Sequence, residues 1–304
     1  MTSILHPPLP HGSQKRADWR APSSLSALSL AVARAAGEHP GLLLAVTRDR
    51  HAARELETEL AIFAPELPVL PFPDWETLPY DLFSPQPDII SQRVATLYRL
   101  PSVARGVLVV PVSTLMQRLA PPGFIAGQSL VVEHGQKLSL ETEKRRLEAA
   151  GYRNVPQVLA PGDFAVRGAL LDIFPMGSPE PYRIELFDED VDSIRTFDPE
   201  TQRSLPAREF PLDEEASKRF RGALRERFPI DPRRCPIYQD MKEGGTPAGV
   251  DYYLPLFFEH TATLFDYLGT DTLCLLGEGA LEAAEAFWAQ TGERHEQRRH
   301  DIER

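Results

Sequence analysis

The sequence predicts an α/β fold in which a parallel sheet carries packed helices and an antiparallel β-rich domain is inserted between its parts. Short uninterrupted apolar runs, typical of strands buried on both faces of a parallel sheet, occur at 41–46, 67–70 and 106–110. Helix-like segments at 49–63 and 88–100 alternate with these runs. Near residue 127 the pattern changes to short strands joined by turn-rich segments, which continue to about residue 205.

Local signals place the helices of the first part. Ser23 or Ser24 can cap a helix that runs to about residue 36. The helix at 49–63 has its apolar residues on one stripe, and a further short helix begins at Ser113. Strands and helices therefore alternate through this part of the chain.

The middle and last parts contain further elements. In the middle part we expect a strand at 129–133, a charged helix at 139–150 and strands at 168–174, 182–187 and 191–197. In the last part we expect helices at 214–227 and 279–290 and a buried strand at 271–276. These patterns predict a first part of the α/β domain at 1–127, a β-rich domain at 128–205 and a second part of the α/β domain at 206–304.

The composition disfavours nucleic acid and membranes as direct partners. Generic DNA affinity comes from Lys and Arg side chains that neutralise phosphates, and this chain has a net charge of −11. No apolar run approaches the roughly 18 residues needed to cross a bilayer, and the first residues lack a signal-peptide pattern. The two cysteines, Cys235 and Cys274, lack metal-site spacing. We therefore predict a cytoplasmic protein with reduced thiols and a protein partner.

Motifs for nucleotide chemistry are missing from the sequence. A P-loop needs glycines that let backbone N–H groups surround phosphate, a Lys for the terminal phosphates and a Ser or Thr for magnesium. Where a strand, loop and helix could carry one, the chain reads Ala21-Pro-Ser-Ser-Leu-Ser-Ala, without glycine or lysine. Gly277-Glu278-Gly279 is a lone G-x-G with an acidic centre. The sequence therefore predicts no catalytic residue and no bound cofactor.

Metal-binding patterns are also missing. The eight histidines are scattered along the chain. Four carboxylates crowd one turn: Asp188, Glu189, Asp190 and Asp192. They could attract a cation, but a solvated hairpin turn is the simpler interpretation, and we predict no metal site.

Strand alternation indicates a candidate binding face in the β-rich domain. Successive side chains of a strand point to opposite faces, so Arg183, Glu185 and Phe187 share one face of 182–187. Arg195 lies on the corresponding side of the next strand, and Arg167 precedes Gly168 at the start of a neighbouring strand. An exposed aromatic beside arginine is typical of binding hot spots. Alternation alone leaves two alternatives open: a docking face, or an aromatic covered by the helix at 139–150.

An ordered series of motifs resembles the N-terminal part of a known bacterial family. The motifs are PDWETLPYD at 73–81, VLVVPVSTLMQR at 107–118, RGALLDIFPMG at 167–177 and YRIELFDEDVDSIRTFD at 182–198. Together they resemble the transcription-repair coupling factor, Mfd, from about residue 20 onward. That region is similar to UvrB, which implies a degenerate, motor-like (RecA-like) α/β domain carrying an inserted β-rich domain that binds UvrA.

The resemblance implies partners and site residues. Arg167, Arg183 and Phe187 match family positions that contact UvrA, and alternation adds Glu185 and Arg195 as further candidates. The family protein is an ATP-dependent DNA translocase whose contacts with RNA polymerase and DNA belong to regions absent from this chain. The chain is thus expected to be a fragment or truncated product, and the missing C-terminal domain is expected to cover the UvrA face.

Departures from UvrB argue against clamping of DNA driven by ATP. UvrB has a working P-loop and a long aromatic hairpin, whereas here only a short segment separates Tyr80 from Ile89. The junction Leu205-Pro206 is also shorter than in family members. The expected function is a non-catalytic module that recruits UvrA to stalled-transcription damage in nucleotide excision repair.

Two alternative functions remain at this point. One is a nucleotide-dependent helicase fragment, which the missing lysine disfavours. The other is a DNA-binding module that uses a local basic patch, at 144–146 or at Arg233-Arg234. The first of these patches is more simply the solvated face of a helix in which Glu141 pairs with Arg145.

Overall fold

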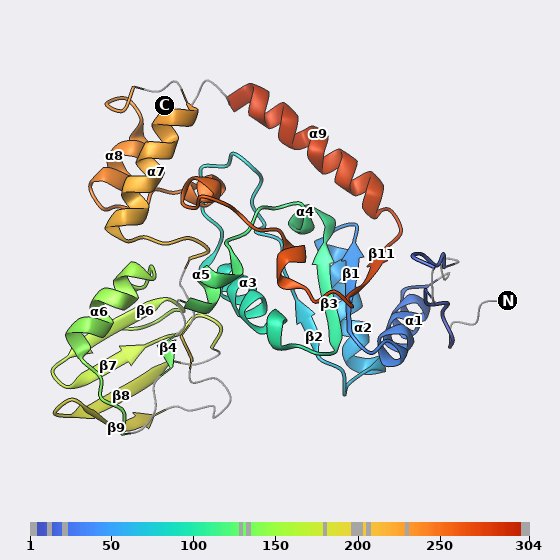
Figure 1. Ribbon diagram of the computed structural model, residues 1–304, viewed down its shortest axis with the longest axis horizontal. Coiled ribbons are helices and arrows are strands. Elements are labelled where there is room, and N and C mark those ends of the chain that lie inside the picture. Colours follow the sequence, from blue (N-terminus) through green and yellow to red (C-terminus); the bar gives the residue numbers. More distant parts are fainter. Residues whose placement is uncertain are drawn as a thin grey trace. The chain divides into compact units, whose positions relative to one another are not determined.

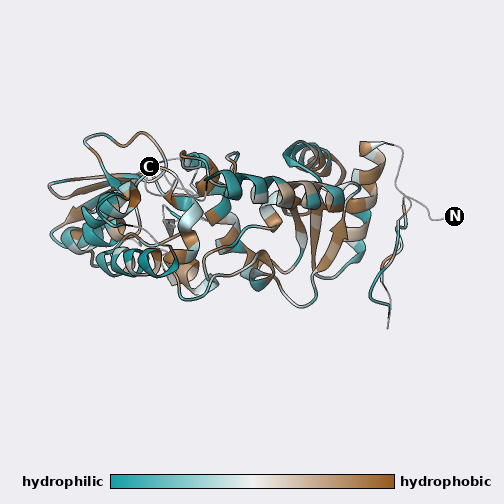
Figure 2. Ribbon diagram, turned by 90° about the horizontal axis from the view of Figure 1, so that it is seen from above, coloured by the Kyte–Doolittle hydropathy of each residue, from teal (hydrophilic) through white to brown (hydrophobic). Residues whose placement is uncertain are grey.

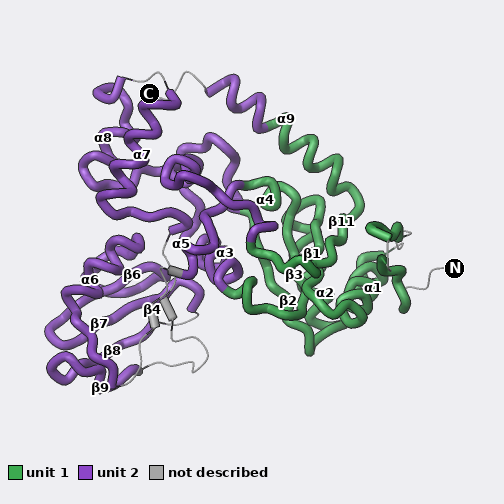
Figure 3. The backbone as a smooth tube through the Cα atoms, viewed as in Figure 1, with its two compact units in different colours: residues 1–74, 99–117, 267–290 green, residues 75–98, 118–266, 291–304 purple. Residues whose placement is uncertain are grey.

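A computed structural model describes residues 5–10, 14–19, 24–127, 130–131, 135–178, 181–195, 203–204, 208–228 and 231–298. The chain, whose elements are labelled in Figure 1, divides into two compact units (Figure 3). Unit 1 comprises residues 1–74, 99–117 and 267–290, and unit 2 comprises 75–98, 118–266 and 291–304. The expected fold class is confirmed: a parallel α/β sheet is interrupted in sequence by a β-rich part. The three-segment domain division stays a prediction.

Unit 1 contains a parallel sheet with the strand order β11–β1–β3–β2. Its strands are β1 (Leu42–Thr47), β2 (Val69–Pro71), β3 (Gly106–Pro111) and β11 (Leu273–Leu276). In the register, Leu44 of β1 pairs with Leu108 of β3 on one side and with Cys274 of β11 on the other. All residues of β1 and β3 are buried, which explains their continuous apolar sequence (Figure 2).

Helices α1 (Leu25–Glu38) and α2 (Arg50–Phe63) pack on this sheet. The α2 helix begins after Asp49, whose side chain accepts a hydrogen bond from the backbone N–H of Ala52 at 2.8 Å. Side chains of both helices, including Val32 and Leu60, join those of β1 and β3 in one core. The short helix α4 (Val112–Leu115) follows β3 directly.

Unit 2 contains a five-stranded sheet with the order β5–β6–β7–β8–β9. Its strands are β5 (Arg153–Asn154), β6 (Asp163–Arg167), β7 (Leu170–Ile173), β8 (Tyr182–Phe187) and β9 (Asp190–Arg195). β6 to β9 pair antiparallel, as expected for the β-rich part, and only the two-residue β5 runs parallel to its neighbour β6. The helix α6 (Leu140–Ala149) precedes β5, and a separate antiparallel pair joins β4 (Leu130–Val131) to β10 (Arg203–Ser204).

The strand predicted at 168–174 is confirmed as β7, Leu170–Ile173, but the strand before it, β6, was not predicted. Gly168 adopts a left-handed φ of 61° and turns the chain between β6 and β7. Arg167 is therefore the last residue of β6, not the beginning of the next strand.

The rest of unit 2 is largely helical. Its elements include most of α3 (Pro87–Arg99), with α5 (Pro122–Gly127), α7 (Glu214–Arg227), α8 (Pro236–Lys242) and two 3-10 helices (Val250–Leu256 and Leu264–Tyr267, the latter ending at the boundary with unit 1). Phe210, Phe220 and Phe257 form an aromatic core in which the ring of Phe257 lies 4.5 Å and 4.8 Å from the other two.

Two remaining helices complete the element order. A 3-10 turn (Leu100–Ser102) follows α3, and α9 (Ala280–Arg298) extends eight residues beyond the predicted end at 290. Within the described part of the chain, no helix is both long and apolar enough to span a bilayer. Phe197 and the Leu205-Pro206 junction lie outside the described residues, as does part of the 21–27 segment.

Candidate protein-docking face

The sheet register brings Arg167 and Arg183 to one face of the β-rich sheet. Residues that stand directly opposite each other in antiparallel strands point to the same side. Arg167 of β6 faces Leu170 of β7, which in turn faces Glu185 of β8. Arg183 lies two residues before Glu185, so its side chain points to the same side.

Phe187 completes this face, which we call the outer face: Arg167, Arg183, Glu185 and Phe187. In β8, exposed or half-buried residues alternate with buried ones, and this pattern confirms the predicted alternation. The buried residues Tyr182, Ile184 and Leu186 belong to the core on the other side, with Phe164, Leu171 and Ile173 of the neighbouring strands.

The exposure of Phe187 excludes one of the two alternatives that the sequence left open, an aromatic covered by the helix at 139–150. Its side chain is 78% exposed, so the helix α6 does not cover it. Phe187 is the last residue of β8 and pairs with Asp190 across a turn in which Asp188 has a φ of 60°. A large aromatic therefore lies at an exposed strand end, where a partner can reach it.

Arg183 is held by a carboxylate on the next strand. Its Nε donates to Oδ1 of Asp172 at 2.6 Å and its Nη2 donates to Oδ2 at 2.7 Å. The two residues stand directly opposite each other in β7 and β8. Hydrogen bonding from the Arg183 guanidinium lowers the pKa of Asp172, against the opposing effect of partial burial. Arg183 is thus a fixed, ion-paired group.

Arg167 lies at the edge of a hollow in the same sheet. Its Nη2 donates to the backbone carbonyl of Pro156, in the loop between β5 and β6. The hollow has a volume of about 730 Å³ and is lined by Pro156, Gln157, Val158, Arg167, Asp172, Pro181, Tyr182 and Arg183. Both arginines of the outer face therefore border one depression.

The two further candidates differ in what the structure describes. Glu185 accepts a hydrogen bond at 2.9 Å from the hydroxyl of Ser193, its cross-strand neighbour. Arg195 stands opposite Arg183 in β9, but its side chain is outside the described part of the structure. The register thus groups all five candidate positions on one sheet, with Arg195 placed by its backbone alone.

The other polar signals in the sequence have local explanations. Asp188 and Glu189 form the turn between β8 and β9, and Asp190 and Asp192 belong to β9. The described residues contain no group of three or more His, Cys, Asp or Glu arranged for a metal. Gly277 follows β11, where an added Cβ would lie 2.8 Å from the carbonyl oxygen of Val46. Close backbone packing therefore accounts for this glycine. In α6, Arg145 lies 3.8 Å from Glu141 in an i, i+4 pair, as the sequence suggested.

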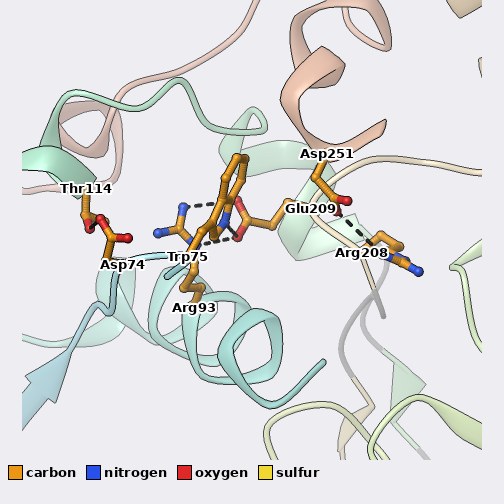
Figure 4. Close-up of polar contacts among 7 residues, drawn as sticks. All are labelled: Asp74, Trp75, Arg93, Thr114, Arg208, Glu209 and Asp251. Atoms are coloured by element: carbon orange, nitrogen blue, oxygen red, sulfur yellow. Dashed lines mark hydrogen bonds and ion pairs between the residues drawn. The ribbon is translucent and has the colours of Figure 1, made fainter. Parts of the chain in front are cut away.

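One buried charged cluster was not found from the sequence. Arg93 of α3 and Glu209 are 0% and 3% exposed, and Nε of Arg93 donates to Oε1 of Glu209 at 2.5 Å (Figure 4). The indole N–H of Trp75 donates to the same oxygen at 3.2 Å, and the guanidinium lies 5.1 Å from the Trp75 ring. The three side chains satisfy one another inside unit 2, so we assign them a structural role.

Neighbouring residues extend this buried polar region within unit 2. Arg208 lies 3.5 Å from the carboxylate of Asp251, and burial raises the pKa of Asp251.

In unit 1, the side chain of Asp74 accepts hydrogen bonds from Ser113 at 2.7 Å and from Thr114 at 3.2 Å. These contacts tie residues far apart in the sequence, and no local periodicity signals them.

Comparison with known proteins identifies the class of domain that carries the outer face. Residues 130–210 match the family described as UvrB interaction domain. This range includes β4 to β10, and so all strands of the five-stranded sheet. The outer face therefore lies within the segment that is similar to the UvrB interaction domain family.

Similarity to longer proteins extends over most of the chain. A transcription-repair-coupling factor of Escherichia coli is 46% identical over 286 residues, or 90% of this chain and 25% of that protein. One of Haemophilus influenzae is 44% identical over 284 residues, with the same two shares, and one of Bacillus subtilis is 28% identical over 276 residues. The chain is thus related to the N-terminal region of the transcription-repair coupling factors, and it spans about a quarter of their length.

Proposed function

We propose that this chain is a non-catalytic module that recruits UvrA in transcription-coupled nucleotide excision repair, with the outer face as its docking surface. The observation that carries the proposal is the exposed Phe187 beside Arg167 and Arg183 on one face of a UvrB interaction domain. The relatives named as transcription-repair coupling factors supply the repair context.

The chemistry of the outer face suits a protein partner. Aromatic and arginine side chains dominate binding hot spots, because they bury much area and offer planar hydrogen-bond donors. Phe187 and Arg183 both project from β8, a strand whose opposite side is fixed in the core. Such a rigid support reduces the entropy lost when the partner binds.

The charged groups support docking in preference to catalysis. The buried ion pair of Arg93 with Glu209 is satisfied inside the protein, whereas the exposed arginines border an open hollow. We assign ATP-driven translocation and the contacts with RNA polymerase and DNA to the regions of the relatives that lie beyond the matched quarter. The module itself acts in the cytoplasm by binding a protein.

A titration of purified UvrA into this chain tests the proposal. We expect Phe187→Ala and Arg183→Ala each to weaken binding by about 10-fold or more, the range of hot-spot residues. Phe83→Ala is the matched control, because Phe83 is 73% exposed but lies outside the β-rich sheet. Wild-type affinity in a folded Phe187→Ala variant would reject the docking face.

A further inference from the structure

The two arginines of the outer face have different electrostatic surroundings. Arg183 forms a bidentate ion pair with Asp172. The side chain of Asp172 is only 15% exposed, and that of Arg183 is 45% exposed. The contact of Arg167 is with an uncharged carbonyl, and among the described residues no carboxylate lies within ion-pair distance of it. The charge of Arg183 is therefore paired with a carboxylate through hydrogen bonds, whereas that of Arg167 interacts with Asp172 without a hydrogen bond.

The position of Asp172 is unusual for a simple surface ion pair. Asp172 stands directly opposite Arg183 in the register, on the same side as the outer face, and it lines the hollow between the two arginines. Exposed ion pairs contribute little to stability, because solvent screens them and holding both side chains in one geometry costs side-chain entropy. A two-point contact to a carboxylate does fix the plane of a guanidinium, which Arg allows and Lys does not.

We propose that Asp172 is a positioning residue of the docking face, which fixes the Arg183 guanidinium in the orientation that UvrA contacts. The proposal rests on the function proposed above. In this arrangement the Arg183 guanidinium is held in one orientation beside the hollow by its ion pair with Asp172. Arg167, which donates to a backbone carbonyl, supplies a positive charge without a hydrogen-bonded carboxylate. A fixed side chain loses less rotamer entropy on binding than a free one.

The direction in which Asp172→Asn changes the affinity for UvrA distinguishes this role from simple charge attraction. If Asp172 positions Arg183, Asp172→Asn breaks the two-point contact and weakens UvrA binding, by about 3- to 10-fold. If instead Arg183 served as a free cation for a carboxylate of UvrA, removal of the competing carboxylate would tighten binding. Tighter or unchanged binding by a folded Asp172→Asn variant would therefore overturn the proposal.

A double-mutant cycle shows whether Asp172 acts through Arg183. We expect Asp172→Asn to have less than about a twofold effect in an Arg183→Ala background, because the group that it positions is absent. Arg183→Lys retains the charge but loses the planar fork, so it should bind nearly as weakly as Arg183→Ala. Equal losses from Asp172→Asn in both backgrounds would show that Asp172 acts independently and would reject the positioning role.

Controls distinguish this inference from the proposed function. Glu141→Gln removes one carboxylate from an exposed ion pair on α6, away from the outer face, and should leave UvrA affinity unchanged. If Phe187→Ala weakens binding and Asp172→Asn does not, only the positioning role fails. If neither substitution weakens binding while thermal unfolding shows folded protein, the docking face and the positioning role both fail.

Discussion

At the scale of single residues, β8 separates the requirements of binding from those of folding. Phe187 is 78% exposed, whereas Ile184 on the same strand is 4% exposed and faces the core. Two positions three residues apart on one strand thus have different roles: the side chain of Phe187 is available to a partner, and that of Ile184 stabilises the sheet.

This separation has a measurable consequence for stability. We expect Phe187→Ala to change the free energy of unfolding by no more than about 0.5 kcal/mol, as is usual for exposed positions. Ile184→Ala should cost about 2–5 kcal/mol, because it opens a cavity in the core. Denaturant titration of both variants measures the difference, and a large loss in Phe187→Ala would show that Phe187 serves the fold.

The Asp172–Arg183 pair predicts a pH dependence at the acidic end. Arg183 lowers the folded-state pKa of Asp172, with a smaller contribution from the charge of Arg167. A carboxyl whose pKa is lowered on folding contributes stability above its unfolded pKa, and this contribution is lost as the pH falls through the folded value. NMR titration of the Asp172 carboxyl should show a higher pKa in Arg183→Ala than in the wild type, and an unchanged pKa would contradict the observed ion pair.

At the scale of elements, the buried pair of α3 and Glu209 fixes the return of the chain from the β-rich sheet. Arg93 and Glu209 are 116 residues apart in sequence but 2.5 Å apart in space. Glu209 is the last residue but one of the segment, 130–210, that matches the UvrB interaction domain family. The pair therefore links α3 to the chain that leaves this domain.

Removal of one partner of this pair should be costly. We expect Glu209→Ala to destabilise the protein by about 3–5 kcal/mol, because the Arg93 charge would remain buried without its carboxylate. The double variant Arg93→Met with Glu209→Leu should lose less than Glu209→Ala, since no charge is left buried. Thermal or chemical unfolding compares them, and a loss below about 1 kcal/mol in Glu209→Ala would reject the structural role.

The elements that the sequence predicted well share a physical cause. β1 and β3 are buried on both faces, so their whole sequence is apolar and the strands are evident without a partner. Alternation in β8 is equally clear, because one side faces the core. It placed Arg183 and Phe187 correctly on one side of the strand.

The elements that were missed depend on signals that local patterns do not carry. β6, which lies before the turn at Gly168, was not predicted, and β5 has only two residues. The Arg93–Glu209 pair and the Arg183–Asp172 contact depend on the packing of separate elements. Glycine in a run of alternating residues was the one available sign of the β6–β7 turn.

At the scale of the whole molecule, the net charge restricts the possible partners. A chain with a net charge of −11 repels the phosphate backbone, apart from any local basic patch. We expect no shift of duplex DNA at micromolar protein and about 150 mM salt. A salt-dependent shift under these conditions would favour the DNA-binding alternative, and charge reversal at 144–146 would then locate the patch.

The relatives are about four times longer than the matched region, so the similarity covers one part of those proteins. Within that module, the docking face occupies one side of a single five-stranded sheet. A small, rigid face of this kind can recruit a partner without any catalytic chemistry of its own.

Site-specific photo-crosslinking tests the docking face most directly. A benzophenone side chain replaces Phe187 in one protein and Phe83 in another, two phenylalanines with similar exposure. With UvrA present, we expect a crosslinked complex from position 187 and none from position 83. Crosslinking from position 83 alone, or from neither position while UvrA still binds the chain, would contradict the assignment of the outer face.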